Sequence, residues 1–217
     1  MKRIIAFLTV LLMALGMCSC KSEFSSKISD TKDALEEVCG AKKAEDEQYS
    51  EMVDTKYSVV QVAADFKEGV YSEVKSKDFT FFGFHTVVDQ SHVKSVFKYL
   101  KADPDSEESG SVANMEVLVI QFKNDDAAQK YYDTILALRK QTYQNNENLG
   151  GKMKNEFVSK KDYFAFACET DFMVFNAYAS IDGSTVFYAF VEGPNAETLK
   201  NEYSAFMKKM ECSIITL

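Results

Sequence analysis

Apolar and polar positions recur with two different periods along this chain, and the change of period predicts where strands and helices lie. Helices with apolar residues three and four positions apart are predicted at 29–39, 91–101, 125–140 and 195–209, with charged loops at 41–56, 103–111 and 141–151. Strands are predicted at 57–62, 70–74, 79–88, 112–122, 163–169, 172–180, 185–192 and 212–217, with a hairpin turn at Asp182-Gly183. This order is typical of an α+β fold, in which helices pack on an antiparallel sheet.

Some of these strands are apolar on both faces, so both faces need cover. In 185–192, Val186, Tyr188 and Phe190 alternate with Phe187, Ala189 and Val191. The helices at 125–140 and 195–209 follow equivalent strands, offset by 68 residues, and each carries one apolar stripe. The pattern therefore predicts two pseudo-repeated strand–helix halves with both helices on one face. The other face is left to the segment 57–100 or to a second chain in a homodimer.

The first twenty residues have a pattern of their own. Lys2 and Arg3 precede 13 largely apolar residues, from Ile4 to Gly16, and these are followed by Met17-Cys18-Ser19-Cys20. A basic start, an apolar run and a short end with small residues are typical of a secretory signal. The run is too short to cross a bilayer core of ~30 Å, which needs about 20 residues. We therefore expect the rest of the chain to lie outside the cytoplasm.

Met17-Cys18-Ser19-Cys20 resembles a bacterial lipobox, in which a cysteine receives a lipid and becomes the first residue after cleavage. The resemblance implies lipid attachment at Cys20, because Ser19 supplies the small residue before the cut, although Met17 stands where Leu is usual. Cys18 is an alternative that would place the large Met17 at the cut, and an ordinary secretory signal is another. The resemblance implies a cell-membrane lipoprotein, with signal peptide 1–19 and lipidated cysteine and tether 20–27. The length and pattern of the remaining residues, 28–217, predict a single α+β domain.

Residues 112–210 also resemble a group of small uncharacterised lipoproteins of Gram-positive anaerobes. The shared features are a strand that ends in an acidic helix cap, Ile120-Gln121-Phe122-Lys123-Asn124-Asp125-Asp126-Ala127-Ala128, and then a strand hairpin and a helix. The resemblance implies helices on an antiparallel sheet. It carries no known activity and therefore assigns no site residue.

Composition and charge narrow the partners. The chain has 217 residues, of which 46% are hydrophobic and 13% aromatic, enough for a packed core. Its net charge is −8, and removing Lys2 and Arg3 with the signal leaves −10. An acidic surface repels nucleic-acid phosphates and anionic lipid headgroups. We therefore exclude nucleic acid as a partner and expect the lipid to hold the chain at the membrane.

Candidate reactive residues are few. After lipidation three cysteines remain, Cys39, Cys168 and Cys212, and their odd number does not indicate a disulfide framework, although one pair could bridge. A Cys39–His85 pair would be reactive only with a lowered thiol pKa. Two segments match the S-x-x-K of penicillin-interacting enzymes without its companion motifs, Ser72-Glu73-Val74-Lys75 and Ser91-His92-Val93-Lys94.

Metal-ligand patterns are equally weak, so we expect no metal and no cofactor. The two histidines, His85 and His92, lack the spacing of a zinc site. Asp103, Asp105 and Glu107 begin like a calcium loop. The loop then departs from the motif, because Glu108 replaces the glycine of the sharp turn and Asn114 replaces the bidentate glutamate.

The sequence thus predicts a lipid-anchored extracytoplasmic protein that is not an enzyme. Its role would be binding or accessory, toward an unknown protein or small-molecule ligand. The alternative is a cell-envelope hydrolase whose site has no recognisable motif.

Replacement of the lipid acceptor tests this prediction. Cys20→Ala should release the protein into the medium or leave the unprocessed precursor, because the thiol that carries the lipid is gone. Cell fractionation and intact-mass spectrometry measure the outcome, with Cys18→Ala as the matched control. A mature protein that begins with a free amine at Lys21 or beyond would contradict it.

Overall fold

The structure is a computed structural model, and it describes residues 23–53, 59–75, 78, 90–148, 154–170 and 173–215. Cys20, His85 and the strand predicted at 79–88 lie outside these residues. The described elements, in chain order, are α2 (Glu23–Cys39), β1 (Lys42–Lys43), α3 (Asp46–Val53), α4 (Val59–Val62), the 3₁₀ helix η1 (Ala63–Phe66), β2 (Val70–Val74), the 3₁₀ helix η3 (Gln90–His92), β3 (Val93–Glu108), β4 (Ser111–Phe122), α5 (Asp125–Asn148), β5 (Lys154–Ser159), β6 (Tyr163–Glu169), β7 (Met173–Asp182), β8 (Thr185–Pro194) and α6 (Glu197–Lys209).

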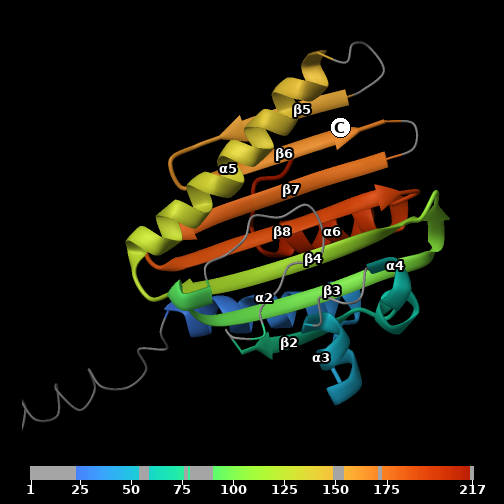
Figure 1. Cartoon of the computed structure of the whole chain (residues 1–217), viewed down its shortest axis with the longest axis horizontal. Helices are drawn as coiled ribbons and strands as arrows, with labels where there is room; N and C mark the ends of the chain where they lie inside the picture. Colours follow the sequence, from blue (N-terminus) through green and yellow to red (C-terminus); the bar gives the residue numbers. More distant parts are fainter. Residues whose placement is uncertain are drawn as a thin grey trace, which may run out of the picture.

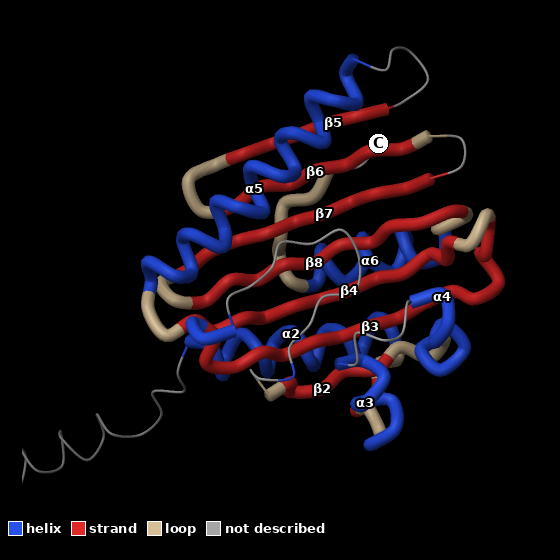
Figure 2. Tube along the Cα trace, viewed as in Figure 1, coloured by secondary structure: helices blue, strands red, loops and turns tan. Residues whose placement is uncertain are grey.

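The strands form one sheet of eight, in the order β1-β2-β3-β4-β8-β7-β6-β5 (Figures 1 and 2). Every neighbouring pair is antiparallel except β1 and β2, which run parallel. Two meanders, β2-β3-β4 and β5-β6-β7-β8, are joined where β4 pairs with β8. The fold is α+β, with helices on an almost wholly antiparallel sheet, as the sequence predicts.

The helices cover both faces of the sheet. Figure 1 shows α5 lying across one face over β5 to β8, with α2 and α6 behind the sheet. Tyr131 and Ile135 of α5 join a core with Val186 and Tyr188, whereas Leu199, Tyr203 and Phe206 of α6 join a second core with Phe187 and Val191. The prediction that both helices share one face is therefore wrong. Phe187 is 1% exposed and is covered within the chain, by α6 and α2 rather than by 57–100.

The 68-residue offset does not mark a symmetric repeat. It equates Val119 with Phe187, and these two residues do face each other in β4 and β8. A true repeat would relate β4 and β8 by a two-fold axis that passes between these residues, perpendicular to the sheet. Such an axis would place both helices on the same face. Because α5 and α6 lie on opposite faces, the two strand–helix units share an order of elements but not an arrangement.

Several predicted elements are confirmed by the structure. The strand predictions for 70–74 and 163–169 match β2 and β6, and those for 112–122, 172–180 and 185–192 match β4, β7 and β8 to within two residues. Glycine supplies the left-handed backbone at two predicted breaks, with φ of 63° at Gly40 after α2 and 52° at Gly183 in the β7–β8 turn.

The main error concerns β3. Residues 91–101 are not a helix, and 103–108 are not a loop, because β3 runs from Val93 to Glu108. The spacing of Val93, Val96, Phe97 and Leu100 imitates a helix because this strand is buried on both sides. Alternation disappears when both faces of a strand are apolar.

The other differences concern short elements and the length of α5. Residues 59–62 form α4 instead of a strand, and the loop predicted at 41–56 contains β1 and α3. The helix α5 continues to Asn148, into the loop predicted at 141–151, and β5 was not predicted at all. Residues 212–215 form no closing strand.

The first helix begins earlier than predicted. Residues 23–27, predicted as part of the tether, are the first turns of α2, and Phe24 is 7% exposed within the α6-side core. In the part of the chain that the structure describes, no helix is both long enough and apolar enough to cross a membrane.

Introducing a charge at Phe187 tests whether the second face is covered from within. Phe187→Asp should lower the free energy of unfolding by at least about 2 kcal/mol, because it removes a buried ring and places a carboxylate there. Urea denaturation measures the loss, and Met173→Asp on β7, where Met173 is 45% exposed, is the control. A folded variant in which only a dimer is lost would instead identify a partner chain as the cover.

Candidate functional site

A cleft of about 800 Å³ lies at the end of the sheet where β7 turns into β8. We call it the end cleft. Its walls come from the start of α2, the start of α5, the β5–β6 connection and the β7–β8 hairpin. The lining residues are Ser26, Lys27, Asp30, Asp125, Asp126, Gln129, Lys161, Asp162, Tyr163, Tyr178, Ser180, Ile181, Asp182, Gly183, Thr185 and Phe187.

Three aromatic rings from adjacent strands form the floor of the end cleft, of which Tyr163 is partly exposed, whereas Tyr178 and Phe187 are almost fully covered. The Tyr163 and Tyr178 rings stack with their centroids 5.6 Å apart, and the Tyr178 and Phe187 rings form a T-shaped pair with their centroids 6.1 Å apart. The register places these rings side by side, because Ser180 pairs with both Tyr163 and Phe187. The Lys27 Nζ lies 4.9 Å from the centroid of the Phe187 ring, within the range of a cation–π contact.

The rim of the end cleft is acidic. It carries five carboxylates, from Asp30, Asp125, Asp126, Asp162 and Asp182, against the two ammonium groups of Lys27 and Lys161. The start of α5, which carries Asp125 and Asp126, is fixed by a helix cap. The Ala127 N–H donates to the Asn124 Oδ1 at 2.9 Å, which caps α5. A Cβ built on Gly183 would lie 3.8 Å from the Asp125 Oδ1, so the hairpin turn approaches the start of α5 closely.

A second unusual feature is an ion pair buried in the middle of the sheet. The Lys98 Nζ on β3 lies 3.8 Å from the Glu116 Oε2 on β4, and both side chains are at most 1% exposed. The Lys98 ammonium also donates to the Met52 carbonyl at 3.4 Å. Neither carboxylate oxygen of Glu116 has a hydrogen-bond partner within the described part of the chain.

Burial controls the ionisation of this pair. It raises the pKa of Glu116 to about 7, against the opposing effect of Lys98 and with a further increase from Glu192. It also lowers the pKa of Lys98, although the Glu116 carboxylate opposes that change. The desolvation penalty on each charge exceeds what the other charge returns.

Arg139 brings another charge to the same face. Its Nε and Nη2 donate to the Tyr188 hydroxyl at 3.2 and 2.9 Å, and its Cζ lies 4.5 Å from the Phe175 ring centroid. Burial raises the pKa of Glu192, and the Arg139 guanidinium opposes that shift. Lys98, Glu116 and Arg139 are buried in the core, and none of them lines the end cleft.

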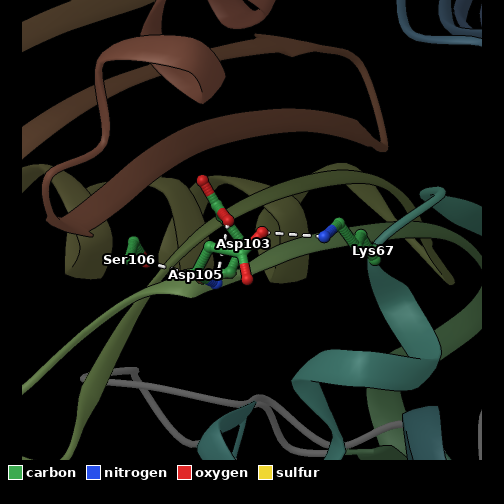
Figure 3. Close-up of polar contacts among 4 residues, drawn as sticks. All are labelled: Lys67, Asp103, Asp105 and Ser106. Carbon is green, nitrogen blue, oxygen red and sulfur yellow. Dashed lines mark hydrogen bonds and ion pairs between the residues drawn. The ribbon is translucent and has the colours of Figure 1, made fainter.

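The acidic segment 103–108, whose first acids match the start of a calcium loop, forms contacts within itself and with Lys67 (Figure 3). The Lys67 Nζ lies 2.7 Å from the Asp105 Oδ2 and supplies the positive charge there. The Asp103 Oδ1 accepts from the Asp105 N–H at 3.1 Å, and the Ser106 hydroxyl donates to the Asp103 carbonyl at 2.6 Å. Within the described ranges, no group of three or more His, Cys, Asp or Glu side chains could hold a metal ion.

The other sequence candidates are dispersed. No disulfide joins Cys39, Cys168 and Cys212 to one another in the described part of the chain. Burial raises the pKa of Cys39 to about 11, which disfavours the reactive thiolate. Ser72 is in β2 and Lys75 follows that strand, so successive side chains there alternate between faces and do not form an S-x-x-K pair.

Comparisons with known proteins add little. No protein-family model matches the chain, and no curated protein matches it either. Among solved structures, the extracellular domain of PknH from Mycobacterium tuberculosis is similar with a TM-score of 0.31 and 9% identity. That match covers 56% of this chain and 66% of that one, just under two thirds. A likeness at this TM-score supports no inference about function.

Acid should stabilise the fold through Glu116, unlike a carboxylate in a surface ion pair. Its folded pKa of about 7 exceeds the ordinary value of 4.5, so the folded state binds the extra proton between these values. The free energy of unfolding should therefore rise as the pH falls from about 7 toward 4.5, by at most about 3 kcal/mol.

The reference for this measurement is the double variant Lys98→Met/Glu116→Leu, in which the titrating pair is gone and the buried volume is largely kept. Urea denaturation at pH 5, 6, 7 and 8 should show the wild type gaining on the double variant as the pH falls. The control is the exposed-pair variant Lys42→Met/Glu68→Leu, which keeps Glu116, so the wild type should not gain on it as the pH falls. An equal pH response of the wild type and the Lys98/Glu116 variant would exclude Glu116 as the source.

Proposed function

We propose that this chain is a lipid-anchored extracytoplasmic binding protein that takes its ligand in the end cleft. The observation that carries the proposal is the end cleft itself, about 800 Å³ in volume, where carboxylates and ammonium groups surround three aromatic rings. Clefts of this size with a few convergent polar groups on an apolar floor are the usual form of small-molecule sites.

The arrangement supports binding because the floor is rigid. Tyr163, Tyr178 and Phe187 stand on three hydrogen-bonded strands, and the rings contact one another. Such a surface can hold a ligand without ordering itself first, which lowers the entropic cost of binding. The polar groups of the rim then select the ligand by charge.

The location of the end cleft agrees with an anchored role. Ser26, Lys27 and Asp30 line the cleft from the first turns of α2. The helix begins at Glu23, three residues after the expected lipid acceptor Cys20. The binding site and the anchor are therefore neighbours along the chain.

Filling the end cleft should abolish binding without unfolding the protein. Ser26 is exposed on α2 and lines the cleft, so Ser26→Trp should place an indole in it. Ser25 is exposed on the same helix and is not a lining residue, so Ser25→Trp is the matched control.

Thermal unfolding of the full chain in detergent would be measured with panels of amines, carboxylates, sugars and phosphates. We expect at least one compound to raise the midpoint of the wild type and of Ser25→Trp and to have no effect on Ser26→Trp. A compound that stabilises all three proteins equally binds elsewhere. If none of the four classes stabilises the wild type, the proposed function is wrong.

A further inference from the structure

The end cleft already holds one cation on its aromatic floor, and this cation comes from the chain itself. The Lys27 ammonium lies 4.9 Å from the Phe187 ring centroid. Lys27 is partly buried and stands on α2, whereas Phe187 belongs to β8 on the sheet beneath. A lysine stem is long and rotatable, so this ammonium can leave the ring for solvent.

The charges around this cation are predominantly negative. The five rim carboxylates come from α2, α5, the β5–β6 connection and the β7–β8 turn, so acids from four separate segments line the same cleft as the aromatic floor. Lys161 is the other cationic lining residue, and it is exposed. A ligand that meets carboxylates from several segments beside an aromatic floor needs more than one positive charge, separated by apolar stems.

We propose that the end cleft binds an aliphatic polyamine and that Lys27 occupies the position of one ligand ammonium in the ligand-free protein. The proposal deepens the proposed function and rests on it. The methylene stems lie over the Tyr163 and Tyr178 rings, and the ammonium groups pair with rim carboxylates such as Asp125 and Asp182. A polyamine must displace Lys27 from Phe187, so Lys27 weakens binding by competition.

Two lysine variants separate competition from net charge. Lys27→Met and Lys161→Met each remove one positive charge from the same rim, and only Lys27 lies over the Phe187 ring. Titration calorimetry of the full chain in detergent, with spermidine as the probe, measures the affinity of each variant. Lys27→Gln is the second variant at this position, and thermal unfolding checks that each protein is folded.

We expect spermidine to bind Lys27→Met about fivefold more tightly than the wild type, because a cation–π contact no longer has to be broken. Lys161→Met should gain less than about twofold, because its exposed charge is screened by salt. Asp125→Asn/Asp182→Asn should weaken binding, and the dianion glutarate should not bind. Two results would overturn the proposed competition between Lys27 and the ligand. One is an equal gain in spermidine affinity from Lys27→Met and Lys161→Met, and the other is no gain from either Lys27→Met or Lys27→Gln.

Failure of this inference differs from failure of the proposed function. If the Ser26→Trp test identifies a ligand of the end cleft that is neutral or anionic and spermidine does not bind, the polyamine is wrong and the binding function stands. If spermidine binds Ser26→Trp as tightly as the wild type, the amine binds outside the end cleft and this inference is overturned. If no compound of any class distinguishes Ser26→Trp from Ser25→Trp, both proposals fall.

Discussion

Strands β4 and β8 are apolar on both faces, and the fold depends on covering both faces at once. Val119 and Phe187 point toward α6 and α2, while Ile120 and Val186 point toward α5. One amphipathic helix buries one side only, so the chain must deliver helices to opposite sides of the same strand pair. This requirement explains why α5 and α6 diverge after leaving neighbouring strands, and why α2 is part of the core.

The buried pair of Lys98 and Glu116 imposes a second constraint on the same strands. Lys98 is opposite Leu118 and Glu116 is opposite Leu100, so the two charges lie diagonally across β3 and β4. A buried ion pair adds little net stability, because desolvation opposes the attraction. A shift of β3 by one residue along β4 would turn Lys98 to the opposite face of the sheet and leave each charge buried without its partner. The pair therefore disfavours the wrong register more than it strengthens the right one.

The sequence was informative where one side of an element faces solvent or where turn chemistry is strict. The Asp182-Gly183 turn and the inward stripe of α6 are of this kind. The sequence pattern led to a wrong prediction for β3, because burial on both sides removes the alternation of apolar and polar residues. It predicted no strand for β5, an edge strand in which Phe157 is the main partly buried apolar residue. Glu116 had a visible signal, since it is the lone charge within the apolar strand β4, whereas Lys98 stands between Lys94 and Lys101 in β3 and had none.

The end cleft had no comparable signal in the sequence. Its residues come from four segments that are far apart along the chain, and exposed aspartates near helix starts and turns are common. The stacking of Tyr163 on Tyr178 depends on strand register, and the contact of Lys27 with Phe187 depends on how α2 packs against the sheet. Neither is set by local sequence, so only the tertiary arrangement reveals that the acids surround an aromatic floor.

The early start of α2 has a consequence for where this protein would meet its ligand. Three residues span at most about 10 Å, so a lipid on the expected acceptor Cys20 would leave the first turn of α2 close to the headgroups. The cleft mouth beside that turn would then sample the thin ionic layer above the bilayer, where anionic headgroups concentrate cations from the surrounding medium. The ligand concentration at the cleft mouth would then depend on the surface charge of the membrane as well as on the ligand concentration in the surrounding medium.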